Sequence, residues 1–232
     1  MTIATAILLA GGSGNRMQGK VEDKILAPLA GKPVIAHSIE AFVSSDQVQH
    51  LVIVTRDAEQ RSELEKIASI VPNRQISLSF TTGGAQRQDS VYAGLQAAPS
   101  ETQIVLIHDC ARPCVTPAAI RESIAKASEF GAACLARPVA DTIKSADTYD
   151  GAYLPTTVDR SKLWAMETPQ TFQYPIILDA YKNIIESGTP ITDDLSAIED
   201  IDQPVAFIDN TRPNPKLTTP SDLPYLEYLL QS

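Results

Sequence analysis

Apolar runs alternate with segments of helical period along the first 136 residues of the chain. The runs are rich in valine, isoleucine and leucine. Segments of about ten to fifteen residues separate them, a pattern typical of βαβ units around a parallel sheet. The sequence therefore predicts an α/β fold. The expected strands are "TAILLA", 50–55, "ISLSFTTGG", 103–109 and "GAACLARPV"; the expected helices are 33–42, "DAEQRSELEKIASI", 86–97 and 117–130.

Polar residues gather where these runs end. The first run leads into "LAGGSGNRMQGKVEDK" (residues 9–24), the third into "TTGGAQRQDS" and the fourth into "HDCARP". The carboxyl ends of parallel strands meet at one edge of a sheet, and ligands of open α/β sheets bind there. We therefore expect Arg16, Arg87, Asp109 and Arg112 to converge on one crevice.

The glycine-rich stretch at 9–24 suggests a backbone cradle for an anion. Gly14 to Lys20 fits a P-loop except at its last position, where Val21 lacks the hydroxyl that holds magnesium. The dinucleotide fingerprint fails as well, because Met17 stands where its third glycine should be. Neither familiar phosphate-binding pattern accounts for this stretch.

The alternation of strand-like and helix-like segments stops at about residue 138. Residues 138–157 alternate polar and β-prone residues around "YDG", which predicts a hairpin or arm. A helix at 175–187, a short strand "PVAFID" and a last helix after "TPSDL" are expected beyond it. We therefore expect one domain over 1–232, with an arm at about 138–160.

Composition disfavours several classes of function. The formal charge of −9 provides no overall basic field for nucleic acid or an anionic membrane. No leader-like segment occurs, and the three cysteines do not make a disulfide framework, so we expect a cytoplasmic protein. A zinc site at His108, Cys110 and Cys114 is disfavoured, because C-x-x-x-C spacing without a second ligand pair is not that of a zinc centre.

Seven motifs occur in a recognisable order: "AGGSGNRM", "GGAQRQDSVYAGL", "HDCARP", "PVADTIK", "VDRSKLWAMETPQTF", "ITDD" and "NPKLTTPSDL". Together they resemble the 2-C-methyl-D-erythritol 4-phosphate cytidylyltransferases of the non-mevalonate isoprenoid pathway. The resemblance runs from Ala6 to Leu223. It implies a mostly parallel Rossmann-like nucleotidyltransferase (GT-A-like) sheet, with helices on both faces and a protruding β-arm.

The family transfers CMP from CTP to methylerythritol phosphate and releases pyrophosphate. The attacking phosphate is mostly dianionic near neutral pH, since its second pKa is about 6, so it needs no general base. It needs charge compensation, because two polyanions must meet and the α-phosphate gains charge in the transition state. Arginine, lysine, backbone amides and Mg²⁺ (or another divalent cation) suit this task.

The resemblance assigns roles to particular residues. Arg16 and Lys24 match the catalytic arginine and lysine, although this chain has Asp23-Lys24-Ile25 where the family usually has Pro-Lys-Gln, and Lys20 is a rival for Lys24. Asp109 matches the acidic residue near the ribose and the metal. Nucleotide-binding positions are matched by Ala10, Gly11, Gly12, Gly14, Gly84, Ala85, Ser90 and Asp109.

The acceptor side of the family site is matched too. In the family the arm crosses to a second subunit, so Thr142 and Arg160 would complete the partner's site and the protein would be a homodimer. One departure is Ala140, where the family often has a basic residue before Asp141. The positions expected to bind the sugar-alcohol phosphate are Arg112, Thr142, Arg160, Thr168, Thr192 and Lys216.

Other functions remain open from sequence. A ribitol-5-phosphate cytidylyltransferase shares the fold, CTP and the arm, whereas a molybdopterin-type guanylyltransferase shares only the first loop. A non-catalytic nucleotide sensor would bind CTP without releasing pyrophosphate. A purely structural protein would not need basic residues at every strand end.

Overall fold

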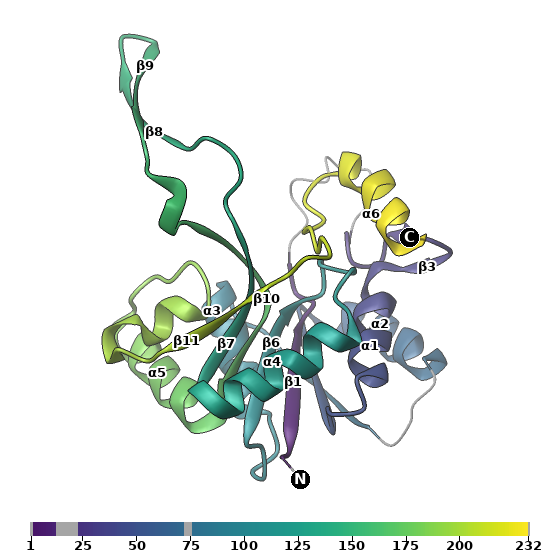
Figure 1. Ribbon diagram of the computed structural model, residues 1–232. Helices are drawn as coiled ribbons and strands as arrows, with labels where there is room; N and C mark the ends of the chain where they lie inside the picture. Colours follow the sequence, from purple (N-terminus) through teal and green to yellow (C-terminus); the bar gives the residue numbers. More distant parts are fainter. Residues whose placement is uncertain (1, 13–22, 72–75, 232) are drawn as a thin grey trace.

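The computed structural model describes residues 2–12, 23–71 and 76–231. Its centre is a seven-stranded sheet in the order β11-β7-β10-β6-β1-β4-β5 (Figure 1). β10 runs antiparallel to both of its neighbours, and the other neighbouring strands pair in parallel. The sheet strands are β1 (Ala4–Leu9), β4 (His50–Thr55), β5 (Ser77–Thr82), β6 (Ile104–Asp109), β7 (Ala132–Pro138), β10 (Trp164–Gln173) and β11 (Val205–Asp209).

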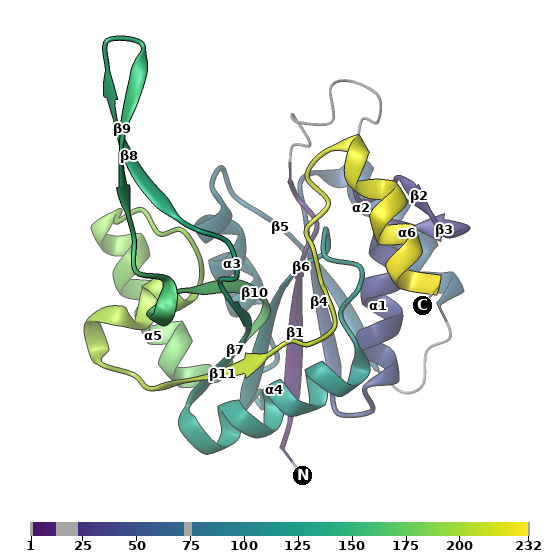
Figure 2. The same ribbon diagram turned by 45° about the horizontal axis from the view of Figure 1, so that its top comes forward.

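Helices cover both faces of this sheet (Figure 1, Figure 2). One apolar cluster joins α1, α2 and α4 to one face, and a second joins α3 and α5 to the other. The fold class expected from the sequence is thereby confirmed. The helices are α1 (Val34–Ser44), α2 (Ala58–Ile70), α3 (Arg87–Gln96), α4 (Pro117–Phe130), α5 (Tyr174–Ser187) and α6 (Leu223–Gln231), with short 3-10 turns η2 (Arg160–Lys162), η3 (Leu195–Ile201) and η4 (Pro220–Asp222).

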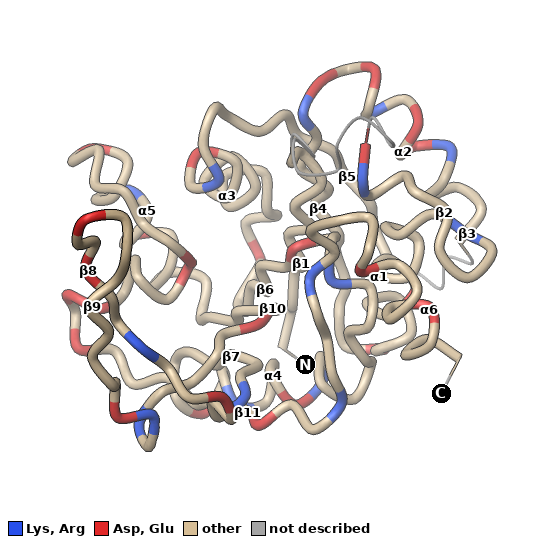
Figure 3. The backbone as a smooth tube through the Cα atoms, turned by 90° about the horizontal axis from the view of Figure 1, so that it is seen from above, with Lys and Arg blue, Asp and Glu red and all other residues tan. Residues whose placement is uncertain are grey.

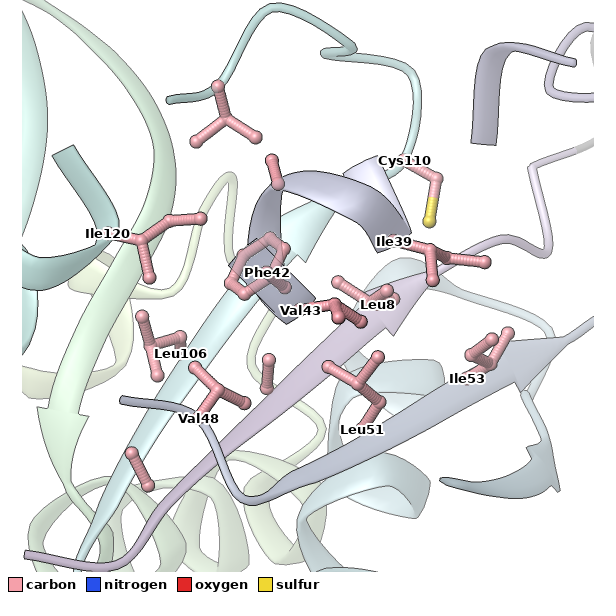
Figure 4. Close-up of a cluster of buried hydrophobic side chains, with 14 of the residues drawn as sticks. Leu8, Ile39, Phe42, Val43, Val48, Leu51, Ile53, Leu106, Cys110 and Ile120 are labelled. Atoms are coloured by element: carbon pink, nitrogen blue, oxygen red, sulfur yellow. The ribbon is translucent and has the colours of Figure 1, made fainter. Parts of the chain in front are cut away.

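The first cluster is built on the central strands. Figure 4 shows Ile39 and Phe42 of α1 over the strand that carries Leu8. Phe42 and Leu8 are fully buried. Side chains of this size contribute about 1.5–3 kcal/mol each when they leave water. This burial explains why β1, β4 and β6 read as continuous apolar runs rather than as alternating ones.

Local capping sets where helices begin beside the carboxyl edge of the sheet. Asp57 accepts a hydrogen bond from the Gln60 backbone amide at 2.8 Å and starts α2. Gln86 and Asp89 form a reciprocal capping box at the start of α3. Such caps satisfy amides that have no partner inside the helix. They place Gln60 and Arg87 in the first turns of their helices.

Strand β10 is an element that the sequence analysis did not predict. Its central residues are buried, yet Glu167, Thr168, Gln170 and Thr171 among them are polar. A buried strand of this composition gives neither an apolar run nor a clean alternation, because polar side chains occupy several of its buried positions. Its register against β7 shifts between Met166 and Gln170.

The arm leaves the sheet after β7 and returns into β10 (Figure 2). It ends in a hairpin of β8 (Lys144–Tyr149) and β9 (Ala152–Thr157), whose residues are all exposed. Asp150 and Gly151 at its tip have φ of 44° and 75°, as a two-residue turn with both positions left-handed requires. The turn that "YDG" predicts is therefore the turn between β8 and β9.

A small third layer lies at the carboxyl edge. β2 (Pro28–Leu29) and β3 (Lys32–Pro33) form a ribbon, and Leu29 packs with Leu226 of α6. Leu217 is fully buried in the same cluster, and its amide donates to the Ala111 carbonyl at 2.7 Å. This anchor fixes the neighbouring Lys216 beside the end of β6. Of the helices in the described ranges, none combines the length and apolarity that crossing a membrane demands.

Gly94 provides a test of the packing of α3. A Cβ added there would lie 2.5 Å from Ile7 Cγ2 and 3.1 Å from Val54 Cγ2, so helix and sheet would have to separate. We expect Gly94→Ala to lower the free energy of unfolding by about 1–2 kcal/mol, because overpacking outweighs the gain in helix propensity. Urea unfolding measures this. Gln96→Ala, exposed on the same helix, is the control, and an unchanged or raised stability of Gly94→Ala would contradict the packing.

Candidate active site

A crevice of about 470 Å³ opens at the carboxyl ends of β1, β4 and β6. Leu9 and Asp109 end two of these strands and both line it. Its volume lies within the range of small-ligand sites. In the view from above, acidic and basic stretches lie side by side next to the labels of β1 and β6 (Figure 3).

The crevice brings together most of the residues predicted from sequence. Arg16 and Gly14, together with the rival Lys20, lie outside the described residues. Arg87, which was expected at this crevice without a specific role, lines it, as does Thr218, for which nothing had been predicted. The predicted residues that line it are Ala10, Gly11, Gly12, Lys24, Gly84, Ala85, Ser90, Asp109 and Lys216.

Charged groups meet at Asp109. Its Oδ2 accepts from Lys216 Nζ at 2.5 Å, and its Oδ1 lies 3.4 Å from Arg87 NH2. Burial opposes the ionisation of Asp109, but the positive charges of Arg87 and Lys216 outweigh it and hold the pKa of this carboxyl well below its usual range. Asp109 is therefore ionised throughout the neutral range.

Arg87 also binds Asp194, a carboxylate whose side chain is fully buried. Two parallel hydrogen bonds, from NH1 and NH2, join them at 2.8 Å each. Burial opposes the charge of Arg87, but the Asp194 carboxylate outweighs it and raises the pKa of the guanidinium. Bidentate pairs of this kind fix geometry as well as charge.

Asp194 is held in turn by α5 and β10. Tyr181 Oη donates to Asp194 Oδ1 at 2.5 Å, and the Asp194 amide donates to Gln170 Oε1 at 2.8 Å. Burial, reinforced by the Asp194 charge, raises the pKa of Tyr181, so its hydroxyl keeps the proton that it donates. Sequence reasoning missed this network, because Arg87 and Asp194 are 107 residues apart. The "ITDD" motif was the one available signal.

Gly83 and Gly84, in the loop that follows β5, allow this loop to approach α3 closely. A Cβ on Gly84 would lie 2.3 Å from Asp89 Cβ, and a Cβ on Gly83 would lie 2.5 Å from Ser90 Oγ. The Gly84 amide donates to Ser90 Oγ at 3.2 Å. The loop therefore presents backbone rather than side chains to the crevice, as close approach to a flat ligand requires.

Lys24 enters the crevice from the other side. Its Nζ donates to the Leu217 carbonyl at 3.4 Å, and its Cε lies 3.7 Å from the position of a Cβ on Gly12. Two lysines distant in sequence, Lys24 and Lys216, thus line the same crevice.

Arg112 lies beside the crevice as a largely buried cation. Its NH1 and NH2 donate to the carbonyls of Asn214 and Met166 at 2.8 and 3.4 Å. Its buried Nε has no hydrogen-bond partner, and no carboxylate of the described ranges lies within salt-bridge distance of it. Burial lowers the pKa of Arg112. A buried cation bound by neutral groups attracts an anion.

The remaining predicted acceptor residues do not line the crevice. Thr168 is buried, and its hydroxyl contacts the Asp109 amide at 3.2 Å and His108 Nδ1 at 3.0 Å. Thr192 is exposed, with its hydroxyl 3.3 Å from Ser196 Oγ. Thr142 and Arg160 are exposed on the arm, where Arg160 donates to the Ala140 carbonyl.

None of the three cysteines is an activated nucleophile. Cys110, Cys114 and Cys134 are free and buried, and burial raises the pKa of each thiol. No group of three or more His, Cys, Asp or Glu that could hold a metal occurs within residues 2–12, 23–71 and 76–231. The arrangement instead gathers cations around one carboxylate, which suits chemistry on bound phosphates.

Comparison with known proteins agrees with this chemistry. The model of the 2-C-methyl-D-erythritol 4-phosphate cytidylyltransferase family matches residues 4–232. The 2-C-methyl-D-erythritol 4-phosphate cytidylyltransferase of Geobacillus kaustophilus is 40% identical over 227 residues, which cover 98% of this chain and 96% of that protein. The chloroplastic enzyme of that name from Oryza sativa is 35% identical over 97% of this chain and 74% of its own length.

Solved structures share the fold. The 4-diphosphocytidyl-2C-methyl-D-erythritol synthase of Anaerococcus prevotii has a TM-score of 0.85 at 23% identity, covering 100% of this chain and 99% of its own. A second crystal structure, of a 4-diphosphocytidyl-2C-methyl-D-erythritol synthase, has a TM-score of 0.78 at 28% identity and covers 99% of both chains.

His108 provides a pH test of the buried shell beneath the crevice. Burial lowers its pKa to about 4, from an ordinary value of 6.5. Below pH 6.5 His108 binds a proton in the unfolded chain but stays neutral in the folded chain until the pH approaches 4. The free energy of unfolding therefore falls as the pH falls. For this residue the loss between pH 7 and pH 5 is about 2 kcal/mol.

We expect His108→Gln to remove this part of the pH dependence. Urea unfolding of both proteins at pH 7 and pH 5 measures it, and contributions from other groups cancel in the difference. Equal losses in the two proteins would show that His108 is not held neutral.

Proposed function

Because the chain belongs to the 2-C-methyl-D-erythritol 4-phosphate cytidylyltransferase family, we propose that its crevice transfers CMP from CTP to methylerythritol phosphate. The products are 4-diphosphocytidyl-2-C-methyl-D-erythritol and pyrophosphate. The observation that carries the assignment of this site is the convergence of Lys24, Lys216 and Asp109 on one crevice. These residues come from distant parts of the chain, and together they suit a bound polyphosphate.

The reaction needs charge compensation rather than proton removal. A phosphate oxygen of the acceptor forms a bond to the α-phosphorus of CTP, and the bond from that phosphorus to the β-phosphate oxygen breaks. We assign to Lys24 and Arg16 the stabilisation of the pentavalent phosphorus and of the departing pyrophosphate. Preorganised cations at developing charge are typically the largest contribution to such catalysis.

The loops on either side of the crevice suit the nucleotide. Gly84, Ala85 and Ser90 would close around the cytosine base, where backbone groups can distinguish a pyrimidine from a purine. Ala10 and Gly11 would close around the same base. Gly12, with Gly14 beyond the described residues, would bind phosphate oxygens through its amide.

Asp109 fits a magnesium ligand, because it is an ionised hard oxygen donor inside the crevice. Mg²⁺ is commonly held by one or two carboxylates together with substrate phosphates, so one carboxylate suffices. Bound there, the ion would neutralise charge on the triphosphate. Lys216 and Arg87 keep Asp109 ionised and in place for it. We therefore propose that the reaction uses Mg²⁺ bound by Asp109 and by the phosphates of CTP.

The acceptor phosphate suits Arg112, whose buried guanidinium has only carbonyl partners among the described residues. Lys216 lines the crevice and would be a further acceptor contact on the same subunit; Thr168 and Thr192 are proposed for the same role from the family resemblance. Thr142 and Arg160 would come from the arm of a second copy.

We also propose a cytoplasmic location, since the three cysteines are free and buried.

The arm itself supports a homodimer. An isolated two-stranded hairpin is marginally stable in water. This one exposes Tyr149 by 64%, Tyr153 by 70% and Leu154 by 56%. Large exposed apolar groups on a protruding hairpin indicate an interaction surface. A second copy of this chain is the partner that we propose.

Turnover tests the proposed function. With CTP and Mg²⁺, we expect pyrophosphate release with methylerythritol phosphate and not with ribitol 5-phosphate, and no release when ATP, UTP or GTP replaces CTP. Lys24→Ala and Arg16→Ala should each lower kcat by about 10²–10³, the usual cost of removing one transition-state donor. Chelation of the metal should abolish release. Pyrophosphate release with ribitol 5-phosphate alone would show that this is the acceptor. CTP binding without pyrophosphate release would show that the protein is a nucleotide sensor.

Mixing inactive subunits tests the shared site. Lys24→Ala inactivates the crevice of the subunit that carries it. Arg160→Ala instead inactivates the arm that this subunit would contribute to the crevice of its partner. A mixed dimer then retains one intact site, so a random mixture of two inactive variants should regain about a quarter of wild-type activity. Mixing Lys24→Ala with Arg16→Ala is the control and should regain nothing. Absence of regain, with dimers seen by sedimentation, would place the arm outside the partner's site.

A further inference from the structure

Gln60 is a buried amide, 2% exposed, that takes no part in the chemistry described above. It lies in the first turn of α2, three residues after the capping Asp57. Its Oε1 accepts from the Arg56 backbone amide at 2.7 Å. Its Nε2 donates twice, to the Ala10 carbonyl at 3.0 Å and to Asp23 Oδ2 at 2.5 Å.

These partners fix the orientation of the amide. Two acceptors face Nε2, and one donor faces Oε1, so a flipped side chain would set like groups against each other. Every hydrogen bond available to Nε2 is made within the protein. Gln60 therefore ties Ala10, at the end of β1, to Asp23, across residues 11–22 of the sequence.

Asp23 is also buried, at 5% exposed. Its Oδ1 accepts from the Ile25 amide at 3.2 Å, and its backbone carbonyl accepts from the Leu26 amide at 3.1 Å. The two bonds form a turn around Lys24. The Arg56 guanidinium lies 3.5 Å from Asp23 Oδ2 and partly offsets the buried charge. The turn then docks on α1 through the Ile35 amide, which donates to the Ile25 carbonyl at 3.0 Å.

From these contacts we propose that Gln60 and Asp23 are positioning residues for Lys24. Gln60 holds the Asp23 turn against the end of β1, and the turn directs the Lys24 side chain into the crevice. The proposal rests on the proposed function, since it acts through the lysine assigned to the transition state. Neither Gln60 nor Asp23 lines the crevice.

The geometry has a kinetic consequence. Lys24 acts where negative charge develops on phosphorus and on pyrophosphate, so a displaced lysine lowers kcat more than it weakens ground-state binding. A misplacement of about 1 Å costs roughly 10²-fold in rate. For Gln60→Met, which keeps the volume and removes the polar atoms, we expect kcat to fall about 10- to 100-fold. KM for CTP and for methylerythritol phosphate should change less than about threefold.

A double-mutant cycle distinguishes positioning from general damage. If Gln60 acts through Lys24, Gln60→Met has no further effect on kcat once Lys24→Ala is present. If Gln60→Met only loosens the fold, its effect on kcat adds to that of Lys24→Ala. Gln49→Met is the matched control, because Gln49 accepts from the Ala4 amide at 2.8 Å at the opposite end of β1. It should lower the melting temperature without lowering kcat.

Hydrogen exchange provides a measurement that is independent of turnover. In the peptide covering residues 23–27, Gln60→Met should speed exchange of the Ile25 and Leu26 amides by about tenfold or more, because opening of the turn becomes easier. Gln49→Met should leave them unchanged. Asp23→Asn, which places an amide donor opposite Gln60 Nε2, should reproduce both effects with little loss of volume.

The outcomes separate the two proposals. Faster exchange together with a non-additive loss of kcat supports positioning by Gln60 and Asp23. Unchanged exchange, or a loss that adds to that of Lys24→Ala, overturns it. If the wild-type protein releases no pyrophosphate, the proposed function fails, and the exchange rates alone then decide whether Gln60 holds the turn around Lys24.

Discussion

The arrangement of the crevice depends on the pairing of Arg87 with Asp194. Asp194 is fully buried, and a buried carboxylate that lost its partner would destabilise the protein by about 3–5 kcal/mol. The pair joins α3 to the segment after α5, and Tyr181 and Gln170 extend it to α5 and β10. Because Arg87 also faces Asp109, the same contact sets the charge at the end of β6. Two helices on one face of the sheet and the strands β6 and β10 are thus tied to one carboxylate.

A chain of formal charge −9 holds polyanions by concentrating cations locally. Lys24, Lys216 and Arg87 line one crevice, and Arg112 is largely buried beside it. Arg87 is largely committed to carboxylates, whereas Arg112 has neutral partners in the described ranges. Arg87 is therefore placed to organise the site, and Arg112 to meet an incoming phosphate. The attacking phosphate is already an anion and needs no base, so the task of the site is to have these charges in place before the phosphates react.

The parts of the molecule that could be predicted from sequence are those governed by local pattern. Runs such as 50–55 are buried on both faces, and turn residues such as Gly151 require positive φ, so both leave a direct signature. β10 left none, since Glu167 and Gln170 inside it are polar and are paired with distant side chains. Asp194 and Gln60 were missed for the same reason. Their importance comes from residues 107 and 50 positions away, and no local period records such a contact.

The two substrates place different demands on the fold. The proposed nucleotide side is built from strand ends and helix starts of this chain, where strand register and helix capping fix the positions of the residues. The proposed acceptor side combines a buried arginine with an arm that is fully exposed in one copy. An isolated two-stranded hairpin is marginally stable in water, so covering its exposed tyrosines would stabilise it. In the proposed dimer, assembly and acceptor binding would then stabilise the same segment, because the arm of the second subunit would complete the acceptor half of the crevice.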